Sequence, residues 1–420
     1  MTYVEFFDKN SIENICACLC YAPNRVVLIG DNEALINRYI KYYEEIFSSR
    51  GNNIEFLCKT VSKNRLDCIV TLLTEIVDTY DDCVFDITGG CEMYNLALGI
   101  VCSKYSGRAL NIHRINLSNN MVYDCDKDGN TISNEMSALS ISENVKAYGG
   151  KVVYGDIEDE KATYLWALSD DFKKDIDLIW NICKKDVRYW NVQINVFDAM
   201  CNVGRKSEDG TTITASREAV ERYLKKKGEK YKKAKGIISY LRKNGLITCF
   251  DDETTSDIIV SFKDDQIKKI LTTAGKILEL KTYLLAKDLK DKNGSPIYND
   301  ALNGVFIDWD GVLHDEKKEG IYDTENEIDV FLMHGAVPMF ISCKNGFVDS
   351  NELYKLETVA TRFGGDYAKK ILVTTSLDSL GDKGKYVRQR ANDMKIKLVE
   401  NVHELDDKAF AKKLNNLWKN

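Results

Sequence analysis

An acidic residue and a lysine in the last third of the chain carry the clearest chemical signal. Asp329 lies in an apolar run that predicts a β-strand, and Lys344 ends the next such run, after a short turn that contains glycine. Because side chains alternate along a strand, Glu327 and Asp329 emerge on one face, as do Ser342 and Lys344. Burying a lysine among apolar strands is costly unless an anion pairs with it. The pair therefore predicts either a salt bridge at a sheet edge or a catalytic site.

A second polar feature lies in the first third of the chain. An apolar strand that ends near Asp86 runs into the sequence TGGCE, and an earlier strand runs into GDN. Backbone amides at a helix start favour anionic groups, and glycines let a phosphate or ribose approach closely. Ligands of open α/β sheets bind at such strand ends, although a tight turn capped by threonine fits the TGG sequence equally well. The candidate ligand-binding residues are Gly30, Asp31, Asn32, Thr88, Gly89, Gly90, Cys91 and Glu92.

The elements that would position these groups fall into three segments of an α/β chain. A chain of 420 residues predicts two or three domains. Residues 1–150 alternate strand-like and helix-like stretches in a Rossmann-like repeat, which is typical of a mostly parallel sheet. Residues 151–262 predict charged helices and then a small unit that resembles a winged helix. Residues 263–420 predict a mixed sheet flanked by helices, with strands at 304–309, 327–333, 338–343 and 370–374.

Charge is uneven along the middle segment. Between Arg217 and Lys243 there are eleven basic residues and three glutamates. Such a stretch is usually a solvated helix face, although it could also attract phosphates. Because no polar recognition-helix pattern accompanies it, we favour an interdomain spacer over a DNA-binding module.

Composition limits the class of protein. The net charge of −7 argues against a general coat for nucleic acid, and no run of about 18 apolar residues predicts a membrane span. The first residues lack the layout of a signal peptide. The thirteen cysteines are odd in number and contain no CxxC pair, which favours buried reduced thiols. We therefore expect a cytoplasmic protein with no membrane partner. Because the sequence contains no GxGxxG motif, we also expect no dinucleotide cofactor.

A third motif offers an alternative chemistry. The sequence FIDWDGVL contains Asp308 and Asp310 in the DxDG arrangement of haloacid-dehalogenase-like phosphatases, and residues 372–376 could supply their second motif. Those folds need further motifs over a longer α/β array than the roughly 110 residues that follow Asp310. A turn after a strand is the favoured role for Asp310 and Gly311.

The last segment resembles restriction-endonuclease-like enzymes of the PD-(D/E)xK type. The resemblance rests on NEIDV, which begins at Asn326, and on FISCKNG, which begins at Phe340. It implies that Asp329 is the main ligand of Mg²⁺ or Mn²⁺, and that Lys344 positions or deprotonates the attacking water. The departure from the family pattern is Ser342, where a second carboxylate is usual.

The missing carboxylate must then come from elsewhere. The candidates are Glu279 on the preceding helix and Glu357 on the following helix, with Glu327 third. If none of them reaches the metal, the resemblance implies weak or lost activity.

The first segment resembles a CARF domain, the CRISPR-associated Rossmann fold. This likeness rests on EFFDKNSIEN near the N-terminus and on DITGG at Asp86. The domain order resembles the CARF–nuclease effectors of type III CRISPR systems, close to the domain-of-unknown-function 1887 group. It implies a homodimer that binds cyclic tetra-adenylate at the two turns and then cuts RNA, DNA or both. Two alternatives stay open: a ligand-sensing DNA-binding regulator with a decayed nuclease domain, and a restriction or repair endonuclease.

Overall fold

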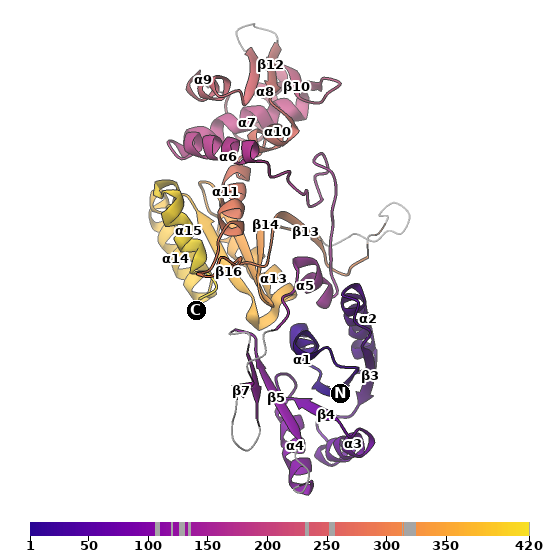
Figure 1. Ribbon diagram of the computed structural model, residues 1–420. Coiled ribbons are helices and arrows are strands. Elements are labelled where there is room, and N and C mark those ends of the chain that lie inside the picture. Colours follow the sequence, from indigo (N-terminus) through magenta and orange to yellow (C-terminus); the bar gives the residue numbers. More distant parts are fainter. Residues whose placement is uncertain are drawn as a thin grey trace.

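The computed structural model describes residues 1–105, 110–118, 121–125, 131–132, 136–231, 235–251, 257–312, 314 and 325–419. The described residues form three sheets, each with its own helices, in an elongated molecule (Figure 1). The chain is therefore a mixed α/β protein, as the sequence predicts.

The first sheet is Rossmann-like. Its strand order is β3-β2-β1-β4-β5-β6-β7, and all pairings from β3 to β5 are parallel. All five residues of the central strand β1 are buried, because helices cover both faces of the sheet. The strands are β1 (Thr2–Phe6), β2 (Arg25–Gly30), β3 (Glu55–Thr60), β4 (Cys83–Asp86), β5 (Asn111–Asn116), β6 (Met121–Asp124) and β7 (Thr131–Ile132).

Helices alternate with the strands of this first body, as the sequence predicts. They are η1 (Ser11–Asn14), α1 (Cys16–Tyr21), α2 (Glu33–Ser49), α3 (Leu66–Thr79) and α4 (Glu92–Lys104). α2 buries Ile36, Ile40, Tyr43 and Phe47, whose spacing of three or four residues makes one apolar stripe. That stripe packs on one face of the sheet, while α3 and α4 form a separate core on the other face.

The third sheet contains the predicted Asp–Lys hairpin. Its order is β17-β16-β15-β14-β13-β8, with antiparallel pairing from β8 to β15 and parallel pairing from β15 to β17. The strands are β8 (Lys151–Val152), β13 (Asp300–Asp308), β14 (Glu325–His334), β15 (Val337–Lys344), β16 (Lys369–Thr374) and β17 (Lys397–Val399). A mixed sheet is thus confirmed.

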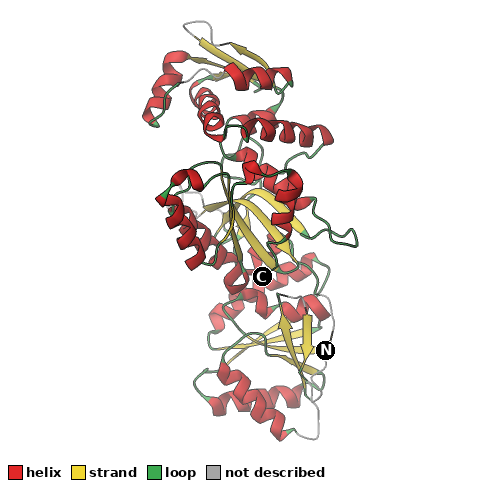
Figure 2. Cartoon of the chain, turned by 90° about the vertical axis from the view of Figure 1, so that its left-hand side faces the viewer, coloured by secondary structure: helices red, strands yellow, loops and turns green. Residues whose placement is uncertain are grey.

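Helices cover both faces of this sheet. Val330 and Ile341 pack with α11 and α15 on one face, whereas the neighbouring Phe331 and Phe340 pack with α5 and α13 on the other. Figure 2 shows the strands between these helical layers. The helices are α5 (Ile141–Ala147), α11 (Lys276–Lys287), α13 (Asn351–Gly364), α14 (Asp382–Asp393) and α15 (Asp407–Asn415), with short turns η2 (Gly365–Tyr367), η3 (Asp378–Leu380) and η4 (Val402–Glu404).

The middle segment does not lie between the two outer segments (Figure 1). It lies beyond α11, at the end of the molecule opposite the first sheet, and α6 packs on α11 (Figure 1). The chain reaches it through an extended stretch in which Trp166 Nε1 donates to Asn303 Oδ1 at 3.0 Å. Its elements are α6 (Asp170–Cys183), α7 (Val187–Val203), β9 (Arg205–Lys206), β10 (Thr212–Ser216), α8 (Arg217–Lys226), α9 (Lys235–Lys243), β11 (Ile247–Asp251), β12 (Asp257–Phe262) and α10 (Asp265–Leu271).

The first and third bodies instead contact each other directly. One hydrophobic cluster runs from Tyr3 in β1 through Val145 in α5 to Phe363 in α13. β8 directly follows the first segment in the chain and pairs with β13, so that Val152 lies opposite Ile307. The outer segments are therefore connected through α5 and through β8, which directly follows residue 150.

The DxDG motif lies at the end of a strand. Asp308 ends β13 and Asp310 accepts the Val312 N–H at 3.0 Å, so this motif forms a turn after a strand, two strands away from β16. The thirteen cysteines all lie in the described residues and form no disulfide.

In the part of the chain that the structure describes, no helix has the length and apolarity that crossing a bilayer requires.

Candidate functional site

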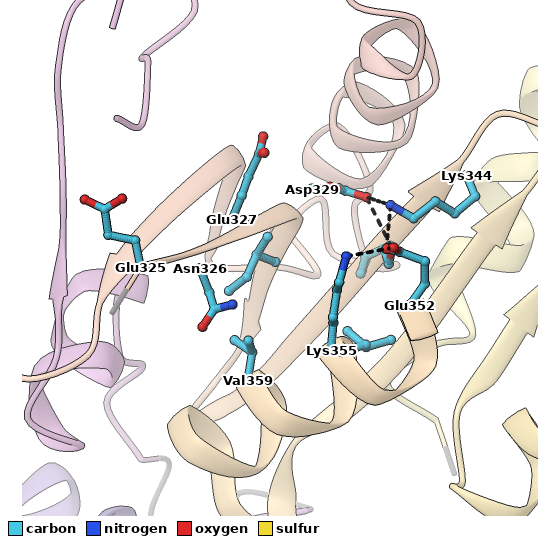
Figure 3. A pocket seen from close by; sticks show the side chains of 12 residues that line it. Glu325, Asn326, Glu327, Asp329, Lys344, Glu352, Lys355 and Val359 are labelled. Carbon is cyan, nitrogen blue, oxygen red and sulfur yellow. Dashed lines mark hydrogen bonds and ion pairs between the residues drawn. The ribbon is translucent and has the colours of Figure 1, made fainter. Parts of the chain in front are cut away.

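Asp329 lies where two strands part. The paired residues of β14 and β15 end at Val330, the residue after Asp329. In the gap, Asp329 Oδ2 accepts the Cys343 N–H at 2.6 Å and the Ser342 hydroxyl at 3.3 Å. Lys344 Nζ lies 3.6 Å from the same oxygen (Figure 3). The structure thus brings together the aspartate, the serine and the lysine that the sequence analysis put on adjacent strands.

A helix supplies another carboxylate to this gap. Glu279 stands in the first turn of α11, and carboxylate oxygens of Glu279, Glu327 and Asp329 lie within 4.8 Å of one another. Oxygen ligands of this kind suit hard divalent cations such as Mg²⁺ and Mn²⁺. The donor set therefore fits such an ion, and two glutamates from other positions offer what Ser342 lacks. We refer to these three residues as the acid cluster.

A buried lysine lies against the acid cluster. Lys276 Nζ is 2.5 Å from Glu279 Oε2 and 3.6 Å from Glu327 Oε1. Burial raises the pKa of Glu279 to about 7; the charges of Asp329 and Glu327 add to this rise, and Lys276 opposes it. Burial alone would lower the pKa of Lys276, but the nearby carboxylates outweigh it and raise that pKa. The cluster has more carboxylates than Lys276 neutralises, which favours a further cation.

Glu352 is a site residue that sequence reasoning missed. It stands in the first turn of α13, and its Oε2 lies 2.9 Å from Lys344 Nζ, closer than Asp329 does. Burial opposes the charge of Lys344, but Asp329 and Glu352 raise its pKa. Although burial opposes the shift, the contact with Lys344 lowers the pKa of Glu352. An acid in the first turn of a helix is common because it complements the helix dipole, so nothing in the sequence set Glu352 apart.

One cavity of about 350 Å³ lies between β14, β15 and the start of α13, and its lining includes Glu327, Asp329, Ser342, Lys344 and Glu352 (Figure 3). Figure 3 shows Asp329, Lys344 and Glu352 converging at one end, with Lys355 beside Glu352 and Glu325 at the far end. A cavity lined by both carboxylates and lysines can hold a cation and an anionic substrate together.

Glu357, a predicted metal ligand and catalytic residue, lies elsewhere. It follows Glu352 by five residues, which turns it about 140° around the helix. Its Oε2 accepts from Lys370 Nζ at 2.5 Å, and it lines a different hollow with Lys369 and Asp393. The structure therefore does not bring Glu357 to Asp329.

The first predicted ligand turn connects β2 to α2. Asn32 Oδ1 caps the helix by accepting the Leu35 N–H at 3.0 Å, while Asp31 forms an ion pair with Lys63 at 3.0 Å. A Cβ on Gly30 would lie 2.8 Å from a methyl of Ile36, which explains the glycine.

The second predicted turn, Thr88–Glu92, connects β4 to α4. Asp86 Oδ1 accepts the Thr88 N–H at 2.7 Å, and Gly90 has a φ of +86°. A Cβ on Gly90 would lie 2.4 Å from Phe6 Cβ, so only glycine fits this close approach. Because β1 separates β2 from β4 in the sheet, the two turns flank the carboxyl end of β1.

The turn after β1 contacts the second predicted turn. Asp8 Oδ2 accepts the Gly90 N–H at 3.2 Å, and Asp8 Oδ1 accepts the Asn10 N–H at 2.8 Å. Asp8 and Asn10 both lie in the EFFDKNSIEN stretch, but the sequence did not mark either of them as a ligand-binding residue.

Comparison with known proteins identifies the fold. No protein-family model matches this chain, and no curated protein sequence matches it. Protein VC1899 from Vibrio cholerae has a similar structure, with a TM-score of 0.73 and 16% identity over 100% of this chain and 98% of that one. Can2 from Sulfobacillus thermosulfidooxidans, solved in complex with cyclic tetra-adenylate, matches with a TM-score of 0.66 and 15% identity over 99% and 97% of the two chains. The chain therefore has the full-length fold of Can2, and the resemblance drawn from its motifs is confirmed at the level of fold.

Proposed function

We propose that this chain is a metal-dependent endonuclease of CRISPR antiviral defence, which cleaves RNA, DNA or both when a cyclic oligoadenylate binds its first domain. The observation that carries the proposal is the acid cluster of Glu279, Glu327 and Asp329 with Lys344 beside it. The cluster lies in a chain whose whole fold is shared with Can2, a protein solved with cyclic tetra-adenylate. An intact cluster argues against a decayed nuclease domain.

The acid cluster would hold Mg²⁺ or Mn²⁺. Such an ion, when bound, polarises the phosphate and lowers the pKa of its water. Asp329 is fixed by the Cys343 N–H and the Ser342 hydroxyl, so the serine orients a ligand rather than replacing one. Because the pKa of Lys344 is raised, this lysine stays protonated near neutral pH. Its role is then to hold an oxygen of the phosphate or of the attacking water by charge.

The two turns at the carboxyl end of the first sheet would bind cyclic tetra-adenylate. Residues 30–32 and 88–92 each open a helix, whose unpaired N–H groups favour phosphate oxygens. We propose that two copies of the chain meet at this end as a homodimer, so that a ring of four nucleotides contacts the same turns from both subunits.

A hydrogen-bonded route connects these turns to the nuclease domain. Asp8 contacts Gly90 and Asn10, and the Asn10 side-chain amide contacts Asp366, donating to its carboxylate and accepting its N–H, each at 3.3 Å. Tyr367 donates a hydrogen bond to Glu13 of η1. The sensor turn after β1 is thus attached to η2, which directly follows α13.

The other end of α13 carries Glu352, which binds Lys344 at 2.9 Å. A shift of α13 that follows activator binding would change how Lys344 is shared between Glu352 and Asp329. Such a ligand activates only if it binds the active arrangement more tightly than the resting one.

Cleavage assays with defined activators test the proposal. Purified protein would be incubated with Mn²⁺, with cyclic tri-, tetra- or hexa-adenylate, and with single-stranded RNA, single-stranded DNA or plasmid. We expect cleavage that requires both the metal and cyclic tetra-adenylate and that is absent in Asp329→Ala and Lys344→Ala. Equal cleavage with and without any activator would indicate a restriction or repair endonuclease, whereas no cleavage of any substrate would refute the enzyme assignment.

A further inference from the structure

Exposed aromatic rings border the nuclease cavity. Phe347 in the loop after β15, Tyr354 on α13 and Tyr386 on α14 are 63%, 46% and 51% exposed. We call these three residues the aromatic row. Large rings left in water at neighbouring positions mark a surface that binds something, since isolated apolar residues are common but a group of them is not.

The aromatic row lies near the cavity but outside its lining. Glu352, in the first turn of α13, lines the cavity, whereas Asp349 and Ser350, just before that helix, line a neighbouring hollow. This second hollow, of about 550 Å³, lies between the Phe347 loop and α14, and Phe347 and Tyr386 form part of its wall. A chain held at Lys344 would meet these two rings where it passes from the cavity to the hollow.

Cations lie over the same rings. Lys383 Nζ is 5.8 Å from the centre of the Phe347 ring, and the Arg390 guanidinium is 5.8 Å from the Tyr354 ring and 5.5 Å from the Tyr386 ring. The surface alternates flat apolar groups with positive groups.

The two carboxylates that line the second hollow are engaged locally. Asp382 forms an ion pair with Lys385 at 3.1 Å, and Asp349 accepts the Asn351 N–H at 3.1 Å. Among the described residues, neither carboxylate forms an ion pair with Lys383 or Arg390, so both cations can contact phosphates.

We propose that the aromatic row binds unpaired nucleotides of the substrate, next to the phosphate that is cut; this inference rests on the proposed nuclease function. An exposed ring needs the free face of a base, which a single strand offers and a duplex keeps in its own stack. Lys383 and Arg390 would contact the phosphates between stacked bases.

Binding measurements without cleavage test this inference. The full chain would be titrated in EDTA, at fixed salt and with cyclic tetra-adenylate, against a labelled single-stranded RNA of about 12 nucleotides and a duplex of the same length. Phe347→Ala and Tyr386→Ala should each weaken single-strand binding between about fivefold and about a hundredfold and leave duplex binding unchanged. The matched controls are Tyr386→Phe, which keeps the ring and should bind as the wild type does, and Phe347→Leu, which keeps apolar bulk and should bind as Phe347→Ala does.

Several results would overturn the proposal. Unchanged affinity in both alanine variants would do so, as would an equal loss for single strand and duplex, or full binding by Phe347→Leu. Light scattering that shows the alanine variants to be monomers and the wild type a dimer would assign the row to a subunit interface instead. If the wild-type chain binds single strands through these rings but never cleaves them, the nuclease function fails while the stacking surface stands.

Discussion

Two groups of carboxylates, one in each outer domain, differ in what surrounds them. In the acid cluster, Glu279 and Glu327 are paired with Lys276. In the first domain, Glu5 and Asp86 lie side by side on β1 and β4, fully buried, and the described residues place no lysine or arginine in an ion pair with either.

Glu13 completes this sensor acid group. Burial raises the pKa values of Glu13 and Asp86 to about 7, and that of Glu5 further. Since burial also raises the pKa of Glu279 to about 7, the two groups differ in their partners: Lys276 lies against the acid cluster, whereas hydrogen bonds from Thr88 and Tyr367 hold the first-domain acids.

The strongest test removes the charge of the acid cluster at Asp329. We expect Asp329→Asn to lower the activator-dependent cleavage rate by about 10³-fold or more, because the metal loses the ligand that two donors hold in place. The rate would be measured with labelled RNA and Mn²⁺. Ser342→Ala is the matched control, and its loss should stay within about tenfold, since it removes only one orienting hydrogen bond. A larger effect at Ser342 than at Asp329 would contradict this assignment.

Lys276→Met tests whether the cluster needs a cation. Without metal, this variant should lose about 3 kcal/mol of unfolding free energy, because it leaves buried carboxylates without their counter-ion. Mn²⁺ should then stabilise it more than it stabilises the wild type. Denaturant unfolding with and without Mn²⁺ measures both effects.

Lys281→Met is the control for this prediction. Lys281 is also buried on α11, but its partners Asp177 and Asp407 are about half exposed and lie outside the acid cluster. If Mn²⁺ raises the unfolding free energy of Lys281→Met as much as that of Lys276→Met, the ion does not act at the acid cluster.

A pH titration tests the sensor group. A carboxyl whose pKa is raised from 4.5 to about 7 on folding binds protons more tightly in the folded state, so its contribution makes stability fall as pH rises through that range. Glu13→Gln should remove about 2 kcal/mol of this pH dependence. Unfolding of the wild type and of the variant at pH 5 and pH 8 gives the difference. An equal change in stability between pH 5 and pH 8 in the wild type and in the variant would show that Glu13 is already ionised in the folded protein.

The smallest expected effect concerns the link between the two regions. Tyr367→Phe removes the hydroxyl that binds Glu13 and keeps the ring. We expect the concentration of cyclic tetra-adenylate that gives half-maximal cleavage to change by about fivefold, which corresponds to about 1 kcal/mol of coupling. The cleavage rate at saturating activator should stay close to that of the wild type. An unchanged activation curve would exclude this contact from the route between the domains.

Local patterns in the sequence were sufficient to predict most of the helices and strands. Apolar strand patterns predicted β13 to β16 to within a few residues, because these strands bury apolar side chains. The strands β14 and β15 also placed Asp329, Ser342 and Lys344 together, since a hairpin has only one compact pairing. Shorter elements such as β8 and α5 were missed, because they depend on neighbours that are remote in the sequence.

The sequence by itself thus determined which residues carry the chemistry on one hairpin, and which turns open helices in the first sheet. Tertiary structure alone decided which glutamates join that chemistry. β14 and β15 part at Asp329, so that α11 can insert Glu279 from one face while α13 presents Glu352 from the other. The physical reason is that helix periodicity fixes the side of a helix on which an acid lies, but only packing fixes what that side meets. Glu357 satisfied the sequence criterion and still points away, because α13 turns it toward Lys370.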